Sequence, residues 1–255
     1  AEPYILGVSS GASAMVALAY YVRLGVSLFR VIPESSAVSM FAFAGAMLSL
    51  LLVYSIGMTG RSGSGNHLVL AGMAVSVILN AVTNFIIAML PNESALKNVT
   101  MWMWGSLAGA RWSNVTLPIV VSVAGLLFFS TFSNSYNLMS LGNETAVSLG
   151  TNVRQMKRIT LFVLSLMTGI FVASCGLIGL IGFIIPHIVR MVAGADHRKL
   201  FPYSYLCGAA FLSSMDIISR TLLAPREMAV GIFSAFCGGP FFVFLLFRRT
   251  KRVKI

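Results

Sequence analysis

Three side chains in this chain could form a catalytic triad if residue type alone decided it. The stretch Gly7-Val8-Ser9-Ser10-Gly11 matches G-x-S-x-G, the pattern that presents a nucleophilic serine on a sharp turn. His187 follows Pro186 inside one apolar stretch, and Asp216 is an acid well inside another. A serine, a histidine and an aspartate brought together perform acyl transfer. On paper, these residues describe an intramembrane serine hydrolase.

The surroundings of these residues favour structural roles instead. The nucleophile pattern needs a strand before its turn, whereas here it opens an apolar helix. Small residues that let helices pack closely in lipid recur at Gly7, Ser9, Gly11 and Ser13. Arg220 lies four residues after Asp216, which predicts an ion pair on one helical face. A lone His187 is better explained by a hydrogen bond to a neighbouring helix than by metal binding.

No residues in the chain have the spacing of a metal or nucleotide site. The three cysteines lie in separate apolar stretches and are interpreted as small packing residues: Cys175, Cys207 and Cys237. The pattern G-x-x-x-x-G-K-[ST], which binds nucleotide phosphates, does not occur in the sequence. We therefore expect no catalytic residue, no metal and no cofactor in this chain, and any use of ATP and magnesium to take place in another polypeptide.

The composition indicates a polytopic helical membrane protein. Of the 255 residues, 57% are hydrophobic and only 10% are charged, whereas a soluble domain has about a quarter charged residues. The net charge of +11 is accordingly attributed to Lys and Arg in cytoplasmic loops rather than to nucleic-acid binding. The fold class predicted is all-α, with a single transmembrane domain over residues 1–255.

Apolar stretches of near membrane-spanning length recur along the sequence. We expect eight segments, at 4–22, 36–58, 67–90, 115–133, 159–177, 180–193, 201–219 and 228–247. Residues 159–193 would form a helix of about 52 Å, too long for one crossing. The glycines Gly176, Gly179 and Gly182 therefore predict a break there, followed by a short segment. Because the chain starts already close to its first apolar segment, we also expect residues before Ala1 to be missing.

The C-terminal tail sets the predicted orientation. It holds Arg248, Arg249, Lys251, Arg252 and Lys254, which places it in the cytoplasm by the positive-inside rule. With eight segments, this orientation leaves 12 Lys and Arg inside and 6 outside. Without the tail the balance is 7 to 6, so the tail decides the assignment.

Two loops between these segments have helical character. Residues 134–158 are predicted to be cytoplasmic, with Asn143 as the N-cap of a short helix, Glu144 in its first turn and Gly150 after its end. Its apolar residues, Leu141, Ala146, Val147 and Leu149, suit either the membrane surface or a groove in a partner protein, and the residues alone do not separate the two. The external loop 91–114 contains Met101–Trp104, typical of an interfacial helix with an aromatic belt.

Five motifs in the same order resemble one family. They are AEPYILGVSSGAS, MWMWGSLAGARW, NLMSLGNETAVSLG, GLIGLIGFIIPHIVRMVAGADHRKLFP and DIISRTLLAPREMAVGIFSAFCGGPFFVFLLFRR. Together they are similar to the FecCD-type permease subunits of ABC importers for ferric siderophores, haem and cobalamin. The resemblance implies a ten-helix permease with two spans before the first segment of this chain. It also implies a second permease, two cytoplasmic ATPases and an external substrate-binding protein as partners.

The resemblance also assigns roles to particular residues. It identifies Leu138–Gly150 as the coupling helix that binds the ATPase, with contacts expected from Leu138, Leu141, Gly142, Glu144, Ala146, Val147, Leu149 and Gly150. It implies that Arg220 docks carboxylates of the binding protein, and we expect Arg226 to assist it. Gly65 and Asn66 fall at the cytoplasmic gate loop. From the residues themselves, Asn80, Thr83 and Asn84 could line the pathway, although helix packing explains them equally well.

The function expected is thus the transmembrane pathway for an iron–siderophore complex in the cell membrane, with haem or cobalamin as lesser options. The preference for a siderophore comes from how common such members are. An ion-coupled secondary transporter is the alternative, but that class places ionisable residues at mid-membrane, and Asp216 is a weak candidate. The serine hydrolase is the least favoured hypothesis.

Overall fold

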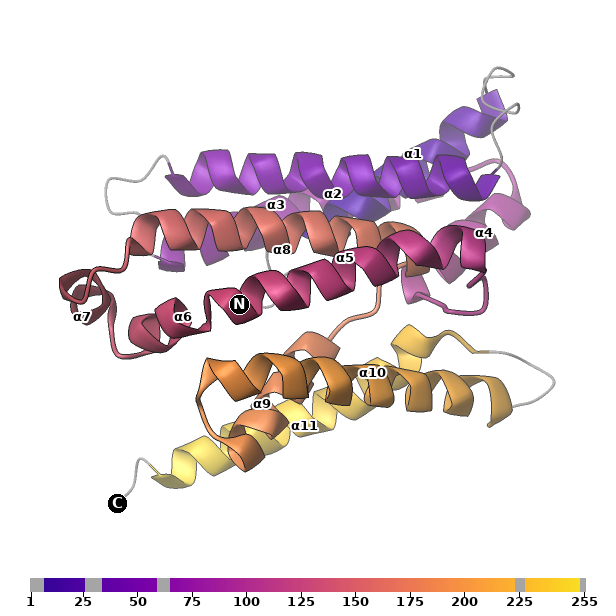
Figure 1. Ribbon diagram of the computed structural model, residues 1–255. Helices are drawn as coiled ribbons and strands as arrows, with labels where there is room; N and C mark the ends of the chain where they lie inside the picture. The colour runs from indigo at the N-terminus through magenta and orange to yellow at the C-terminus, as the bar shows by residue number, and fades with distance from the viewer. Residues whose placement is uncertain (1–6, 26–33, 59–64, 223–227, 253–255) are drawn as a thin grey trace. The chain divides into compact units, whose positions relative to one another are not determined.

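The computed structural model describes residues 7–25, 34–58, 65–222 and 228–252. All the regular secondary structure in these ranges is α-helical, which confirms the predicted all-α class. The helices (Figure 1) are α1 (Val8–Gly25), α2 (Glu34–Met58), α3 (Gly65–Ala88), α4 (Glu93–Trp104), α5 (Trp112–Thr131), α6 (Ser133–Ser140), α7 (Asn143–Ser148), α8 (Val153–Cys175), α9 (Ile181–Ala193), α10 (His197–Thr221) and α11 (Val230–Arg252).

The helices group into two compact units. The first unit comprises Ala1–Val121 and Thr160–Leu177, and the second comprises Ser122–Ile159 and Ile178–Ile255. Helices α5 and α8 therefore each contribute residues to both units. The units are described one at a time below.

The first unit is built on a close approach of α1 to α2. Gly11 and Gly45 face each other, and a Cβ added to either glycine would overlap the carbonyl oxygen of the other. The Ser49 hydroxyl donates a hydrogen bond of 2.6 Å to the Gly7 carbonyl across the same contact. The buried side chains around it are small and apolar: Val8, Ala12, Val16, Val38, Ala42, Ala46 and Val172. The small residues of α1 therefore have the packing role that their pattern predicts.

The second unit packs α9 against α10 and α11. Ile185, Val189 and Leu200 form its buried core, with Phe211 packed against them. The chain enters α9 through Leu180, which has a left-handed backbone with φ 69°. Gly238 of α11 lies directly against the Leu180 side chain, where a Cβ would be too close. The absence of a side chain at 238 thus makes room for the turn before α9.

The predicted break in residues 159–193 is present. Helix α8 ends at Cys175, Gly176 has a φ of 72°, and α9 begins at Ile181. Helix α9 has only 13 residues, as the short segment after the break requires. Gly182, by contrast, lies inside α9 and not in the turn. Among the described residues, no atom lies within 4 Å of where a Cβ on Gly182 would be.

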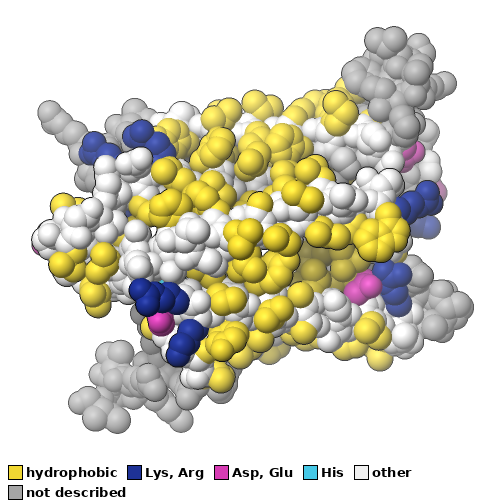
Figure 2. Space-filling view, viewed as in Figure 1, with side chains coloured by type: hydrophobic (Ala, Val, Ile, Leu, Met, Phe, Trp, Pro, Cys, Tyr) yellow, Lys and Arg dark blue, Asp and Glu magenta, His cyan; other side chains and the backbone are white. Residues whose placement is uncertain are grey.

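Four helices among the described residues are long and apolar enough to cross a bilayer, those at Glu34–Gly57, Val69–Ala88, Trp112–Thr131 and Val153–Cys175. Shorter apolar helices lie at Val8–Val22, Ile181–Ala193 and Val230–Phe241. Figure 2 shows hydrophobic side chains exposed over the bodies of the helices, with Lys and Arg gathered near helix ends. These features indicate an integral membrane protein, while the number of eight spans stays a prediction.

One expectation for the external loop is wrong in part. Helix α4 forms, and Trp104 is 43% exposed. Trp102, however, packs against the α1–α2 core instead of joining an exposed aromatic belt. The reason is that α4 contacts α1, and Gly176 leaves space directly beside the Trp102 carbonyl.

Replacing Gly11 by alanine should destabilise the first unit by about 1–3 kcal/mol, because the new methyl group must displace the Gly45 backbone. Thermal unfolding in detergent, followed by tryptophan fluorescence, would show a lower Tm. Gly208→Ala in α10 is the matched control, since no atom lies within 4 Å of a Cβ there. The control should leave Tm unchanged or raise it through helix propensity, and an equal loss in both variants would contradict the α1–α2 contact.

Candidate functional site

Helix α7 is a six-residue helix whose direction is set by two glycines. Gly142 is its N-cap with φ 122° and ψ 148°, and Gly150 follows its C-cap with φ 84°. Backbones of this kind favour glycine because it has no Cβ. Gly150 therefore lies where the sequence predicts, after the end of the helix. Asn143, which the sequence predicts as the cap, is instead the first helical residue.

The outer face of α7 presents apolar side chains to its surroundings. Leu141, Val147 and Leu149 are 68%, 60% and 58% exposed, and Glu144 lies among them. We call these four residues the α7 surface. On the opposite face Ala146 is completely buried, and Leu138 on α6 is half-buried. Because α7 packs on α6, the α7 surface faces away from the protein that supports it.

Helix α6 is joined to the start of α10 by side-chain hydrogen bonds. Asn137 Nδ2 donates to Asp196 Oδ1 at 2.7 Å, and its Oδ1 accepts from the His197 backbone N–H at 2.9 Å. His197 Nδ1 lies 2.7 Å from the same Asn137 oxygen. One turn earlier, Asn134 Oδ1 accepts from Arg198 Nε at 2.9 Å. We call Asn134, Asn137, Asp196, His197 and Arg198 the α6–α10 polar cluster.

Aromatic rings pack beside the α6–α10 polar cluster. Tyr136 of α6 meets Phe201 of α10 edge to face, with ring centroids 5.5 Å apart. Phe129 on α5 lies 5.9 Å from Phe201, and His197 lies 6.0 Å from Tyr136. Such pairs add about 0.5–1.5 kcal/mol each beyond their burial. The contact between α6 and α10 thus has both polar and apolar parts.

The surroundings of Asp196 and His197 lower the pKa of both side chains, which favours an ionised Asp196 and a neutral His197 near neutral pH. The Asn137 side chain, followed by the Arg198 backbone N–H, holds the pKa of Asp196 below its ordinary value. Burial, followed by the positive charge of Arg190, lowers the pKa of His197, and the Asp196 charge opposes this. Since Asn137 Oδ1 is an acceptor, His197 donates from Nδ1 in the neutral state.

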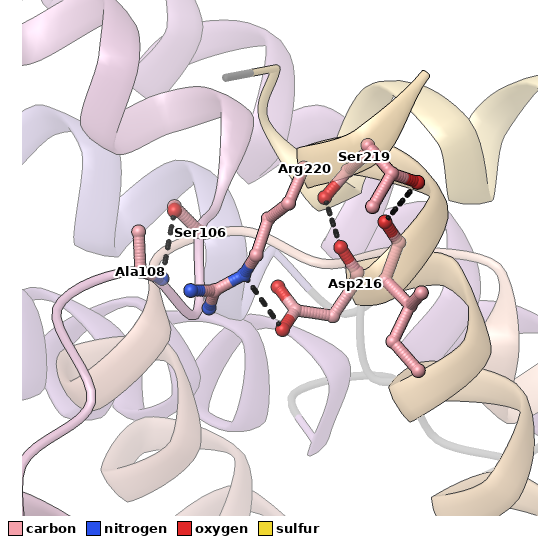
Figure 3. A network of polar contacts seen from close by, with 7 residues as sticks. Ser106, Ala108, Asp216, Ser219 and Arg220 are labelled. Atoms are coloured by element: carbon pink, nitrogen blue, oxygen red, sulfur yellow. Dashed lines mark hydrogen bonds and ion pairs between the residues drawn. The ribbon is translucent and has the colours of Figure 1, made fainter. Parts of the chain in front are cut away.

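The other charged pair of the second unit lies at the far end of α10. Arg220 Nε is 3.0 Å from Asp216 Oδ2, with side chains 39% and 21% exposed. Figure 3 shows the guanidinium of Arg220 turned back along its own helix toward this carboxylate. Among the described residues the buried Nε–H has no hydrogen-bond acceptor, so this contact is an ion pair by distance without being a hydrogen bond. The predicted i,i+4 pair is confirmed.

The residues of the hypothetical hydrolase have other partners. Ser9 is buried within α1, and its carbonyl accepts from the Ser13 hydroxyl at 3.1 Å. His187 stacks on Phe183, with centroids 6.2 Å apart, and Asp216 faces Arg220. No group of three His, Cys, Asp or Glu side chains able to hold a metal occurs in the described part of the chain.

The remaining predicted site residues are placed as follows. Gly65 and Asn66 begin α3, but the side chain of Asn66 and the whole of Arg226 are outside what the structure describes. On α3, Asn80 and Asn84 are exposed, whereas Thr83 is buried and donates to the Leu79 carbonyl at 2.8 Å. Their roles in a gate, a docking site or a pathway stay predictions.

The α6–α10 polar cluster was not predicted from the sequence. Asp196 to Lys199 simply fall between the predicted segments 180–193 and 201–219. Two signals were available: the Asn134 and Asn137 spacing, which aligns both amides on one helical face, and Asp196 as a capping residue. Asp196 does cap α10, accepting from the Arg198 backbone N–H at 3.0 Å. This cap starts α10 at His197, earlier than the predicted segment at 201.

Comparison with known proteins identifies a family. The model of the FecCD transport family matches residues 1–248. The chain is 38% identical over 252 residues to the cobalamin import system permease protein BtuC of Halobacterium salinarum, covering 99% of this chain and 65% of that protein. It is 35% identical over 260 residues to the hemin transport system permease protein HmuU of Yersinia pestis, covering 99% and 74%. It is 38% identical over 254 residues to the Fe(3+)-citrate import system permease protein YfmD of Bacillus subtilis, covering 100% and 72%.

Solved structures are similar in fold. A structure described as an inward-facing metal-chelate type ABC transporter matches with a TM-score of 0.85 and 27% identity, over 97% of this chain and 76% of that one. PsaBC from Streptococcus pneumoniae matches in fold alone, with a TM-score of 0.60 and 17% identity over 94% of this chain and 86% of that one. The chain spans 65% to 74% of the length of the three relatives named above.

Acidification should weaken the α6–α10 polar cluster. Because the pKa of His197 is lowered from its ordinary 6.5, the unfolded chain binds the proton first as pH falls, so stability is full above pH 6.5 and declines below it. The lowered pKa of Asp196 acts in the same direction, but only below its ordinary 3.8. We expect Tm to be flat from pH 8 to 6.5 and to fall toward pH 5. His197→Gln should flatten that decline, and an unchanged slope would exclude His197 as its source.

Proposed function

Because this chain belongs to the FecCD transport family, we propose that it is the transmembrane permease subunit of an ABC importer for an iron–siderophore complex. Members of the family are transport components rather than enzymes. In this proposal residues 1–255 act as one permease domain in the cell membrane, with the C-terminus in the cytoplasm. ATP is hydrolysed by separate cytoplasmic subunits, consistent with the lack of a nucleotide-binding motif in the sequence.

The α7 surface is the single observation that supports this function best. A six-residue helix cannot span a membrane, yet Leu141, Val147 and Leu149 remain largely exposed. Such a helix suits a groove in another protein, which takes up its apolar side chains. We assign this groove to the cytoplasmic ATPase. The attachment of α6 to α10 then holds the α7 surface in a fixed direction.

The other end of α10 is assigned to the external substrate-binding protein. Arg220 is 39% exposed, so it can offer its guanidinium to a carboxylate of a docked protein. Arg226 assists in this proposal. Because α6 contacts the first turn of α10 and Arg220 lies in its last turn, the two assigned surfaces lie at opposite ends of one helix. This arrangement suits one surface in the cytoplasm and the other outside.

The remaining partner is a second permease, identical or different, which completes the pathway between the two chains. Gly65 and Asn66 of this chain would belong to the cytoplasmic gate of the pathway. The exposed amides of Asn80 and Asn84 would offer polar groups to a passing chelate. Thr83 would contribute packing, since its hydroxyl is already used within α3. Transport would proceed as the permeases alternate between outward-open and inward-open states.

The substrate class is the least constrained part of this proposal. Relatives are described as importing cobalamin, hemin and Fe(3+)-citrate, all of them compact metal chelates. We favour an iron–siderophore complex within that range. Growth of a deletion strain on a panel of ferric siderophores, haem and cobalamin would identify the substrate, and growth deficient only on haem or cobalamin would overturn the siderophore assignment.

Val147→Asp should separate the permease from its ATPase. Burying an unpaired carboxylate in an apolar groove costs several kcal/mol, so the two subunits should no longer purify together. Val147→Ile keeps an apolar side chain of similar shape and should retain the ATPase at the wild-type ratio. Retention of the ATPase by Val147→Asp would contradict the assignment of the α7 surface.

Arg220→Glu should weaken docking of the binding protein at least tenfold, because a pair of opposite charges becomes a pair of like charges. Vesicles containing the transporter would be titrated with labelled binding protein at low salt. Asp216→Asn is the control, since it releases Arg220 from its intramolecular partner and should leave docking equal or tighter. Unchanged affinity in Arg220→Glu would remove this residue from the docking surface.

A further inference from the structure

We propose that Asn137 is a positioning residue that locks the ATPase-binding segment to α10, so that movement of α7 displaces α10 as one body. This inference rests on the proposed binding of an ATPase to the α7 surface. It adds the connection by which that binding reaches the rest of the second unit. Asn137 is not expected to touch the ATPase, the binding protein or the substrate.

Asn137 is the central side chain of the α6–α10 polar cluster. Its amide nitrogen donates to the Asp196 carboxylate, and its single oxygen accepts two hydrogen bonds from His197, one from the backbone and one from the ring. The hydrogen bond to a carboxylate is charge-assisted and therefore stronger than a neutral one. The single side chain of Asn137 on α6 thus makes hydrogen bonds to two consecutive residues at the start of α10, Asp196 and His197.

These contacts act on the backbone of α10 itself. Asp196 is the N-cap of α10 and also accepts from the Arg198 backbone N–H, while the His197 N–H is bonded directly to Asn137. A force on Asn137 is therefore applied to the first turn of the helix rather than to a long, bendable side chain. The Asn134–Arg198 hydrogen bond and the Tyr136–Phe201 ring contact oppose rotation about this point.

The route from the α7 surface to this point is short and continuous. Helix α7 packs on α6, and Ala146 of α7 is fully buried. The turn between them is closed by backbone hydrogen bonds from Leu141 to Leu138, at 3.1 Å, and from Gly142 to Met139, at 3.3 Å. Helix α6 in turn contacts α10. If α7 is displaced, either α10 therefore moves with it or the hydrogen bonds of the α6–α10 polar cluster break.

Helix α10 is long enough to transmit that displacement. Its 25 residues extend about 37 Å at 1.5 Å per residue, and the Asp216–Arg220 pair lies in its last two turns. Both ends belong to the second unit. In this proposal α10 links the ATPase-facing segment to the surface assigned to the binding protein, so nucleotide binding inside and docking outside influence each other.

An exchange of the two side chains tests the link without changing the composition or the net charge. Asn137→Asp puts two carboxylates in contact and removes the donor to Asp196. Asp196→Asn alone is mild, because an asparagine oxygen still caps the helix and still accepts from Asn137. The double variant restores a donor at 196 and an acceptor at 137 for His197. Asn137→Ala removes both functions and adds no charge, which provides a second variant if Asn137→Asp folds poorly.

The complete transporter, with its ATPases and binding protein, would be reconstituted in vesicles. Three quantities would be measured: the ATPase retained, the basal ATP hydrolysis, and the stimulation of hydrolysis by loaded binding protein. For Asn137→Asp we expect retained ATPase, basal hydrolysis within twofold of wild type, and stimulation lowered roughly tenfold, as loss of a charged hydrogen bond predicts. Asn137→Ala should show the same pattern, and the double variant should recover stimulation to within about twofold.

Normal stimulation in both Asn137→Asp and Asn137→Ala would overturn the proposal. So would loss of bound ATPase in these variants, because Asn137 would then only shape the α7 surface. Failure of the double variant to recover, with its ATPase still bound, would show that the Asn137–Asp196 contact is not the link and would overturn it equally. A wild-type transporter that neither binds an ATPase nor responds to a binding protein would instead refute the proposed function, before any variant is compared.

Discussion

A helix in hydrocarbon has no water to satisfy its polar groups, and this constraint explains most of what the polar residues of the chain do. Hydroxyl groups in the apolar helices donate to a carbonyl four residues earlier on the same helix. Examples are Ser13 to Ser9, Thr83 to Leu79, Ser165 to Leu161 and Thr168 to Leu164. The hydroxyl groups of these four residues are therefore already hydrogen-bonded. Ser9 of the G-x-S-x-G stretch is buried within α1 instead of being presented on an exposed turn, so it lacks the setting of a nucleophile.

Several contacts between distant polar side chains lie at helix ends, although Ser122 of α5 and Tyr205 of α10 meet within the bodies of their helices. Inside the first unit, α1 and α2 meet through glycine backbones and small apolar side chains. The charged and amide side chains that bridge elements of the second unit gather instead at the start of α10, and an ion pair lies near its end. Packing thus fixes the bodies of the helices, while polar groups fix where one element is joined to the next.

The sequence predicts the helices better than it predicts their partners. Apolar length and glycine spacing locate the eight longer apolar helices, with ends that differ by up to six residues, and also the break after Cys175, because these depend on local chemistry. Trp102 was placed wrongly, since its burial depends on α4 meeting α1, a contact no local pattern encodes. Asn137 was missed for the same reason: its partners lie 59 and 60 residues further along the chain. For the α7 surface, the residues suggested an exposed apolar face. They did not decide whether the membrane surface or a partner protein covers it, and only the family resemblance favoured the ATPase.

The two glycines that flank α7 have an evolutionary consequence. Gly142 and Gly150 turn the backbone through conformations that depend on the lack of a side chain, and Ala146 is the buried residue of α7. The outward residues of α7 contribute little to its own placement. If the α7 surface binds an ATPase as proposed, substitutions on that surface could match the permease to a different energising subunit without redirecting the helix.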